Sequence, residues 1–482
     1  MPQTCDLAPL TEFVPDAAHP WDRAAALHLH RRLGYGLAPG ELDGVLADDP
    51  AAHVRARLSA AAALPPFARP PWHDWTVDDY TDASQYVDQV NAWRAAWIDD
   101  LRDRPWRAKL CLFWSGHFVT ALEKYQCPSY MWAYLDVIQR HAFGDLREFV
   151  RAVGTTPAML IYLDGVFNSR VSPNENYARE LFELFTLGEG NGYTQSDVAE
   201  AARALTGYNG FTVGCAPIGY VPAGHDPGGK TIFGATAPFD YDGLVDHLFA
   251  ARGPLIARHV CGRLYGHFVS EDPDAGVVAQ LADVLIAADW RLGAVYERLF
   301  TSAHFFSPAL RAVRIKDPLE LLLGAERALA TDALRTPELT GAIGFQAGNL
   351  GQLLFDPPDV AGWPGGREWV NANLLSLRGQ VTQQILFLAL QADRLALTAW
   401  ARAVGPPDES DVDGVAAAIA DFVLPKGLAT AAEYAQAARV MRGEVPSYYY
   451  DAGLWDLDFE YAPEQVALLL DYLMRRPEYQ LA

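Results

Sequence analysis

The sequence contains few cysteines and no long apolar run. Five of its 482 residues are cysteine, at positions 5, 111, 127, 215 and 261. They form no CxxC pair and no zinc-ribbon spacing, so the common zinc modules are excluded. The pattern favours no disulfide framework, although it leaves a single bridge open. No stretch approaches the roughly 18 uncharged apolar residues of a membrane-spanning helix, so we expect no transmembrane segment.

The sequence also lacks a recognisable export signal. Residues 1–10 have neither a basic n-region nor an apolar h-region. On this evidence we expect a cytoplasmic protein. Removal of a signal, or export together with a partner, would also account for the pattern.

Basic side chains are scarce relative to acidic ones. Sixty Asp and Glu residues face 38 Lys and Arg residues, which gives a net charge of −22. This charge opposes binding to a phosphate backbone or to anionic lipid, so we expect no nucleic-acid partner. Half of the residues are hydrophobic and 12% are aromatic, which is enough for a large folded core.

Residues 172–188 (SPNENYARELFELFTLG) combine helix signals with a dense set of polar groups. Ser172 and Glu175 have capping-box spacing, and Gly188 is suited to ending the helix. At about 100° per residue, one face of this helix is polar and the opposite face is apolar. The polar arc consists of Glu175, Asn176, Arg179, Glu180 and Glu183.

Two interpretations of this polar arc stay open. In the first, Glu175, Arg179 and Glu183 form solvated ion pairs at i, i+4 spacing, each worth a few tenths of a kcal/mol. In the second, Asn176, Glu180 and Glu183 point into a cleft, where clustered carboxylates bind a metal or share a proton. Spacing alone favours the first.

Further histidines and carboxylates lie outside this helix. A second capping box, Thr194 with Asp197, opens a helix that leads towards His225 and Asp226 in a glycine-rich loop. His117 lies in an aromatic segment, where a satisfied core histidine is the more common outcome. If these groups converge, they form a mixed imidazole and carboxylate site suited to Zn, Mn or Fe. The predicted metal ligands are His117, Glu180, Glu183, His225 and Asp226.

Several blocks occur in an order that resembles the bacterial family called domain of unknown function 1800. They include residues 113–118 (FWSGHF), 174–176 (NEN), 178–180 (ARE), 183–188 (ELFTLG), 202–207 (ARALTG), 225–226 (HD), 316–320 (KDPLE), 351–352 (GQ), 362–366 (GWPGG) and 475–479 (RRPEY). The resemblance implies an architecture but no reaction. It also implies that relatives carry export signals and lie beside exported proteins of another uncharacterised family, numbered 1501.

The hydrophobic pattern predicts a mostly α fold. Helical patterns cover residues 21–33, 40–60, 83–117 with a break at Pro105, and 129–153. Short β-type segments at 211–213, 219–221 and 231–233, separated by Gly and Pro, predict a small hairpin insert near 210–234. We expect an N-terminal helical segment over 1–70, a main helical domain over 71–380 and a C-terminal helical segment over 381–482.

Two functions of different classes follow. The first is a metal-assisted enzyme, hydrolytic or oxidative, with Glu180, Glu183, Asn176 and Arg179 as catalytic residues. Its predicted substrate-binding residues are Arg203, Lys316, Trp363 and Arg378. The second is a noncatalytic binding or assembly protein that acts with an exported partner of the family numbered 1501. In that case a structural network joins the helices to the loop at 355–369, and its members are Glu175, Asn176, Arg179 and Glu180.

Overall fold

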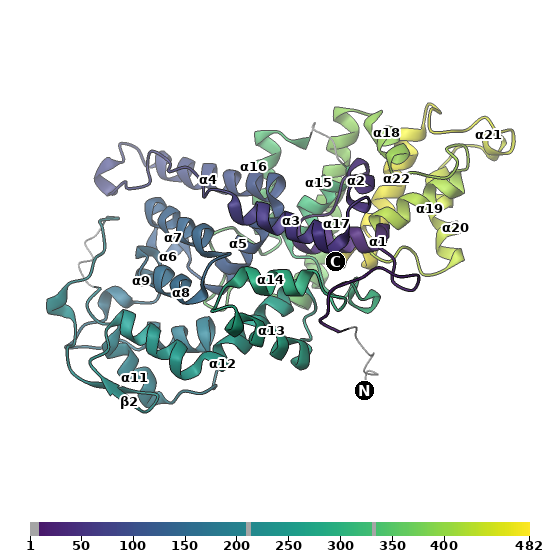
Figure 1. Ribbon diagram of the computed structural model, residues 1–482. Coiled ribbons are helices and arrows are strands. Elements are labelled where there is room, and N and C mark those ends of the chain that lie inside the picture. The colour runs from purple at the N-terminus through teal and green to yellow at the C-terminus, as the bar shows by residue number, and fades with distance from the viewer. Residues whose placement is uncertain (1–8, 209–213, 330–333) are drawn as a thin grey trace.

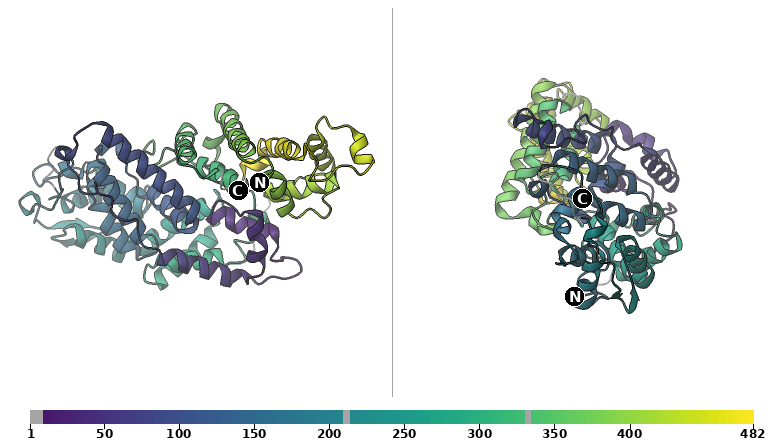
Figure 2. Two further views of the ribbon diagram at one scale, coloured as in Figure 1. Left: turned by 90° about the horizontal axis from the view of Figure 1, so that it is seen from above. Right: turned by 90° about the vertical axis from the view of Figure 1, so that its left-hand side faces the viewer.

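A computed structural model describes residues 9–208, 214–329 and 334–482. The described residues form an elongated body of packed helices with one short hairpin, which confirms the predicted mostly α class (Figure 1). The helices of residues 396–474 gather at one end of the molecule and those of residues 122–204 at the other, whereas the first helices of the chain lie near the C-terminal ones (Figure 1 and Figure 2). Buried apolar side chains run through both ends.

Among the described residues, nine α-helices precede the polar motif. They are α1 (Arg23–Leu33), α2 (Leu42–Leu46), α3 (Pro50–Ala63), α4 (Ser84–Asp103), α5 (Pro105–His117), α6 (Leu122–Tyr125), α7 (Pro128–His141), α8 (Leu146–Gly154) and α9 (Pro157–Tyr162). The helix predicted over 40–60 is in fact α2 and α3, because Asp49 caps a new helix at Pro50. The helix predicted over 129–153 divides in the same way, where Asp145 caps α8.

The motif helix differs from its prediction at the N-terminal end. Helix α10 (Asn176–Glu180) begins four residues after Ser172, and a π-helix (Leu181–Thr186) continues it. The Ser172 capping box does not form. Ser172 instead pairs with Ser169 in an isolated bridge, and the backbone N–H of Asn174 donates to Asn168 Oδ1 over 2.9 Å. A local turn therefore replaces the first helical turn.

The hairpin insert lies at the end of the predicted range. Strands β1 (Lys230–Ile232) and β2 (Ala235–Ala237) pair antiparallel, with Thr231 opposite Thr236. Before them, α11 (Gln195–Ala204) begins at the predicted capping box of Thr194 and Asp197. The predicted β-type segment at 211–213 lies outside the described residues, and residues 219–221 form no strand.

The remaining helices complete the core and the C-terminal end. They are α12 (Tyr241–Phe268), α13 (Ala275–Ala287), α14 (Leu292–Phe300), α15 (Pro318–Leu329), α16 (Pro337–Asn349), α17 (Ala372–Ala392), α18 (Ala396–Ala403), α19 (Val412–Val423), α20 (Ala431–Arg442), α21 (Ser447–Asp451) and α22 (Ala462–Met474). Helix α12 is 28 residues long and packs against α8, α11, α13 and the π-helix. It therefore connects the motif region with the centre of the molecule.

One disulfide joins two loops at the motif end of the molecule. It links Cys127, at the start of α7, with Cys215, which is 88 residues further along the chain. This is the single bridge that the cysteine spacing left open. Cys111 and Cys261 are free and buried.

Within the described residues, none of the helices has the length and apolar character needed to span a membrane.

Candidate functional site

The charged groups of the motif helix pair with one another. Arg179 donates to Glu175 over 3.1 Å and to Glu183 over 3.3 Å, which is the i, i+4 ladder of the first interpretation. Gln195 on α11 joins the same group, since it accepts from Arg179 over 3.0 Å and donates to Glu175 over 2.6 Å. The side chains of Arg179 and Glu175 are both more than one-third exposed. This part of the arc is an ion-pair network at the surface.

The other two residues of the arc face the protein rather than this network. Asn176 Nδ2 donates to Asp164 Oδ2 over 3.3 Å. Glu180 is half-buried, and burial together with the neighbouring Glu183 raises its pKa. Tyr162 has a raised pKa of about 12 because it is buried and lies near Asp359 and Glu180. Tyr162 therefore lies between Glu180 of the arc and Asp359 of the loop at 355–369.

His117 contacts the backbone of the π-helix. Its Nε2 donates to the carbonyl of Phe185 over 3.1 Å, and His259 on α12 donates to the carbonyl of Leu184 over 3.0 Å. A π-helix shifts its hydrogen bonds by one residue, and both histidines lie where this shift occurs. His117 is buried, and burial lowers its pKa well below the usual value. Its neutral ring thus supports the backbone.

The loop that contains His225 and Asp226 is a turn packed on α11. Asp226 accepts from Arg203 over 2.7 Å and from the backbone N–H of Gly228 over 2.8 Å. His225 is buried, and its Nδ1 lies 3.0 Å from the carbonyl oxygen of Thr206. Asp226 therefore shapes the turn, as aspartate side chains often do.

The metal site predicted from the sequence requires its five residues to converge. Among the residues that the structure describes, no group of three or more His, Cys, Asp or Glu side chains is placed to hold a metal ion. His117, His225 and Asp226 each contact a different backbone segment instead. The described residues do not assemble this site, and a bound divalent metal stays a prediction.

The predicted substrate-binding residues are distributed over the molecule. Arg203 pairs with Asp226 and Glu200. Arg378 is fully buried and donates to Gln480 over 2.8 Å and to the carbonyl of Lys316 over 2.9 Å, and Lys316 is itself buried. Only Trp363 lines the large cleft described next.

A cleft of about 370 Å³ lies between α5, α12 and the loop after α16. Four blocks of the family resemblance, far apart in the sequence, supply part of its wall: residues 113–118, 316–320, 351–352 and 362–366. The wall residues from these blocks are Phe113, Gly116, Asp317, Gln352, Trp363, Pro364, Gly365 and Gly366. The motif helix and the loop at 225–226 contribute none of the residues that line it.

Two glycines allow the loop at 361–369 to form this wall. Gly362 has φ +99°, and a Cβ there would lie 2.7 Å from the carbonyl oxygen of Gly116 at the end of α5. Gly366 has φ +57°, and a Cβ would lie 2.3 Å from the carboxylate of Glu271. A side chain at position 362 would push the loop away from α5, whereas one at position 366 would strain the left-handed backbone and displace the Glu271 carboxylate. The glycines are required for close packing.

Helix α12 supplies the polar groups of the opposite wall. Arg263 and His267 are four residues apart and therefore share one face, with Gly262 and Gly266 beside them. Arg263 is exposed in the cleft, where the surrounding protein lowers its pKa, and it has no ion-pair partner within the described parts of the chain. His267 Nε2 is buried without a hydrogen-bond partner there.

A buried ion network underlies the cleft. Glu320 pairs with Lys109 over 2.6 Å and with Arg314 over 3.2 Å. Burial alone would raise the pKa of Glu320, but Arg314 and Lys109 outweigh burial and hold it well below its usual range. Burial and the nearby Glu320 raise the pKa of Asp317, which lines the cleft.

This network also affects His267. Burial and the neighbouring Arg314 lower the pKa of His267 well below its usual value. The cleft thus presents a guanidinium, a neutral imidazole and a buried carboxyl group of raised pKa, beside Trp363 and Trp369. Together these groups can bind an anion, accept a proton and contact a flat apolar surface.

Residues 28–481 match a family described as "protein of unknown function (DUF1800)". No curated protein and no solved structure matches the chain. The match covers nearly the whole sequence and agrees with the order of motifs from residue 113 to residue 479. The chain therefore belongs to the family of proteins of unknown function numbered 1800.

Proposed function

We propose that this protein binds a small organic anion in the cleft between α12 and the loop at 361–369, and that the cleft is an enzyme active site. The observation that carries the proposal is the exposed, unpaired Arg263 in a cleft formed by four of the blocks of the family resemblance. By contrast, Arg179 and Arg203 on other parts of the described chain pair with carboxylates.

The ligand class follows from the chemistry of the walls. The guanidinium of Arg263 is suited to a carboxylate or a phosphate group, which it can bind through two N–H donors. Trp363 and Trp369 offer apolar faces for a ring or a sugar. The cleft volume of about 370 Å³ is within the range of small-molecule sites.

His267 is the proposed proton acceptor. Because its pKa is lowered, the imidazole is neutral near pH 7, and a neutral ring in the cleft wall can accept a proton from a ligand hydroxyl group. Asp317, with its raised pKa, is the second titratable group of the cleft. An acid–base pair of this kind supports hydrolysis, isomerisation or elimination.

The proposal is tested by ligand binding to matched variants. Carboxylates and phosphate monoesters are compared with neutral amide and alcohol analogues by calorimetry on the full chain. We expect anions to bind and Arg263→Met to weaken them about 10- to 100-fold, because a hydrogen bond to a charged group is worth about 1.5–3 kcal/mol.

The control is Arg258→Met, which removes another exposed arginine of α12 outside the cleft wall. It should bind the same anions as the unchanged protein. Equal affinity of Arg263→Met and Arg258→Met for the anion would overturn the proposal. For the chemical role, His267→Gln should lower turnover of a bound ligand more than it lowers affinity.

A metal-assisted reaction, hydrolytic or oxidative, stays a separate proposal. Its support is the pair of neighbouring carboxylates, Glu180 and Glu183, which lie close enough to raise the pKa of Glu180. Elemental analysis of protein purified without chelator, with Glu180→Ala and His225→Ala alongside, tests it. Zn, Mn or Fe at near one ion per chain, lost in both variants, is the expected result.

A noncatalytic assembly role is favoured by a different observation. Glu175, Arg179 and Gln195 use their polar groups on one another, as expected for a network that maintains structure. In this version the protein acts with an exported partner of the family numbered 1501. Copurification that depends on the loop at 355–369 and not on Arg263 would separate this role from the enzyme proposal.

The cellular compartment is a further proposal. The amino-acid sequence favours the cytoplasm, whereas the disulfide of Cys127 and Cys215 is typical of oxidising compartments. Cell fractionation combined with thiol labelling distinguishes them. A cytoplasmic protein should be labelled at Cys127 when it is denatured without reductant, because this residue is buried in the folded chain.

A further inference from the structure

A small cavity lies on the other side of the segment at 316–320 from the large cleft. It has a volume of about 30 Å³ and is lined by residues from α1, α15, the end of α19 and the C-terminal turn. This is room for one or two water-sized species, since one water needs about 10–15 Å³. A monatomic halide ion therefore fits.

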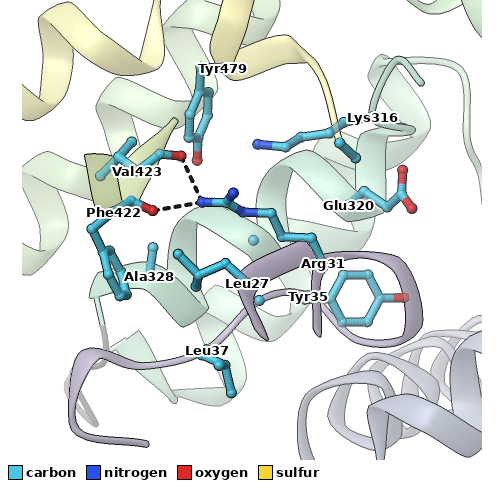
Figure 3. A pocket seen from close by; sticks show the side chains of 13 residues that line it. Leu27, Arg31, Tyr35, Leu37, Lys316, Glu320, Ala328, Phe422, Val423 and Tyr479 are labelled. Atoms are coloured by element: carbon cyan, nitrogen blue, oxygen red, sulfur yellow. Dashed lines mark hydrogen bonds between the residues drawn. The ribbon is translucent and has the colours of Figure 1, made fainter. Parts of the chain in front are cut away.

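Cationic groups converge on this cavity. Figure 3 shows the ends of Lys316, Arg31 and Tyr479 pointing into the same space. Lys316 is 6% exposed, and its Nζ lies 3.7 Å from the centre of the Tyr479 ring. Arg31 lies close enough to Lys316 to lower its pKa, together with the larger effect of burial.

Lys316 has no acidic partner at this position. No carboxylate of the described residues lies within ion-pair distance of its Nζ. Glu320, which also lines the cavity, directs its Oε1 to Lys109 and Arg314 and accepts the backbone N–H of Asp317 at Oε2. A guanidinium nitrogen of Arg31 donates to the carbonyls of Phe422 and Val423, over 2.6 and 3.2 Å.

The surroundings add further positive charge. Near this segment, buried or half-buried cations outnumber the two buried carboxylates, Asp317 and Glu320. The cations are Arg31, Arg32, Lys109, Arg314, Lys316 and Arg378. Arg378 Nη1 and Arg32 Nη1 are buried without a partner in the described chain. Burying cations with so few neighbouring carboxylates costs free energy unless an anion binds beside them.

We propose that the cavity between Lys316 and Arg31 binds a monovalent halide, chloride under physiological conditions. The ion lies between the ammonium and the guanidinium and also accepts from the hydroxyl of Tyr479. It keeps Lys316 charged at a position where burial would otherwise favour the neutral amine. The site is separate from the cleft and independent of the function proposed for it.

The first experiment locates the ion directly. Crystals of the full chain grown with bromide in place of chloride are measured at the bromine absorption edge. We expect an anomalous peak between Lys316 Nζ and the Arg31 guanidinium. A cavity that shows only water, or nothing, in bromide would overturn the proposal.

The second experiment measures in solution how chloride binding changes the stability of the folded chain. Thermal unfolding is compared in sodium chloride and sodium gluconate at equal ionic strength. We expect chloride to raise the Tm in a saturable way, because an ion that binds only the folded chain stabilises it. Lys316→Met should abolish this difference, whereas Lys426→Met, at an exposed lysine, should retain it.

An equal chloride response in Lys316→Met and the unchanged protein would count against the site. If Lys316→Met does not fold, the bromide measurement on the unchanged protein decides the question.

Discussion

The motif helix and the cleft differ in how they use their polar groups. On the motif helix, Arg179 satisfies two carboxylates and a glutamine at the surface. In the cleft, Arg263 has no ion-pair partner and His267 Nε2 has no hydrogen bond among the described residues. A side chain that is already paired mainly maintains structure, whereas an unpaired polar group in a concave wall is available to a ligand. Density of polar residues in the sequence is thus a weaker indicator of a site than their lack of partners.

The largest expected effect is a loss of stability when an ion pair is broken, and it should differ between the two regions. Glu320→Ala leaves Lys109 and Arg314 buried without their carboxylate, which should lower the free energy of unfolding by about 3–5 kcal/mol. Glu175→Ala removes an exposed pair of the motif helix and should cost less than about 1 kcal/mol. Urea denaturation measures both. Losses of similar size would contradict the contrast between the two regions.

The second prediction concerns the disulfide between Cys127 and Cys215 near the motif helix. Cys127→Ser opens a loop of 88 residues and should lower the free energy of unfolding by about 2–4 kcal/mol. The double variant with Cys215→Ser should lose no more than the single one, because both remove the same bond. Additive losses in the double variant would show that the two cysteines act independently.

The fold could largely be predicted from the sequence because its local signals are strong. The capping box of Thr194 and Asp197 begins α11, and Pro105 separates α4 from α5. The predicted start of the motif helix is wrong because the side chain of Asn168, a residue outside the motif, accepts the backbone N–H of Asn174. The sequence offers no local indication of that contact.

The site was predictable only in part. Trp363, predicted to bind substrate, lines the cleft, as do residues of the blocks at 316–320 and 351–352, but the convergence of these segments depends on tertiary packing. Arg263 and His267 were missed, although Gly262 and Gly266 repeat beside them at the same four-residue spacing in α12. That repeat indicates a helix face with little bulk and two polar side chains, and it could have been detected.

The third prediction tests the backbone of the cleft wall. Gly366→Ala places a Cβ against the carboxylate of Glu271 in a left-handed conformation, which should cost about 1–2 kcal/mol and weaken anion binding. Gly266→Ala, within α12, adds its Cβ to open space and should leave the protein equally stable or more stable. Thermal unfolding compares the two. An unchanged Tm in Gly366→Ala would show that the loop is free to move.

The smallest effect concerns Glu180 on the motif helix. Its pKa is raised in the folded protein by burial and by Glu183, so ionised Glu180 opposes folding once the pH exceeds its pKa in the unfolded chain. Glu180→Gln should therefore stabilise the protein at pH 7, by less than about 1 kcal/mol because the group is half-exposed, and should lose this advantage in acid.

Denaturation curves of Glu180→Gln and the unchanged protein at both pH values measure this difference. The same variant should bind anions in the cleft as the unchanged protein does, because Glu180 does not line it. A variant that is stabilised at neutral pH and keeps its anion affinity would identify Glu180 as a strained structural residue. Loss of anion binding in Glu180→Gln would instead mean that the two regions form one site, and the contrast between them would fail.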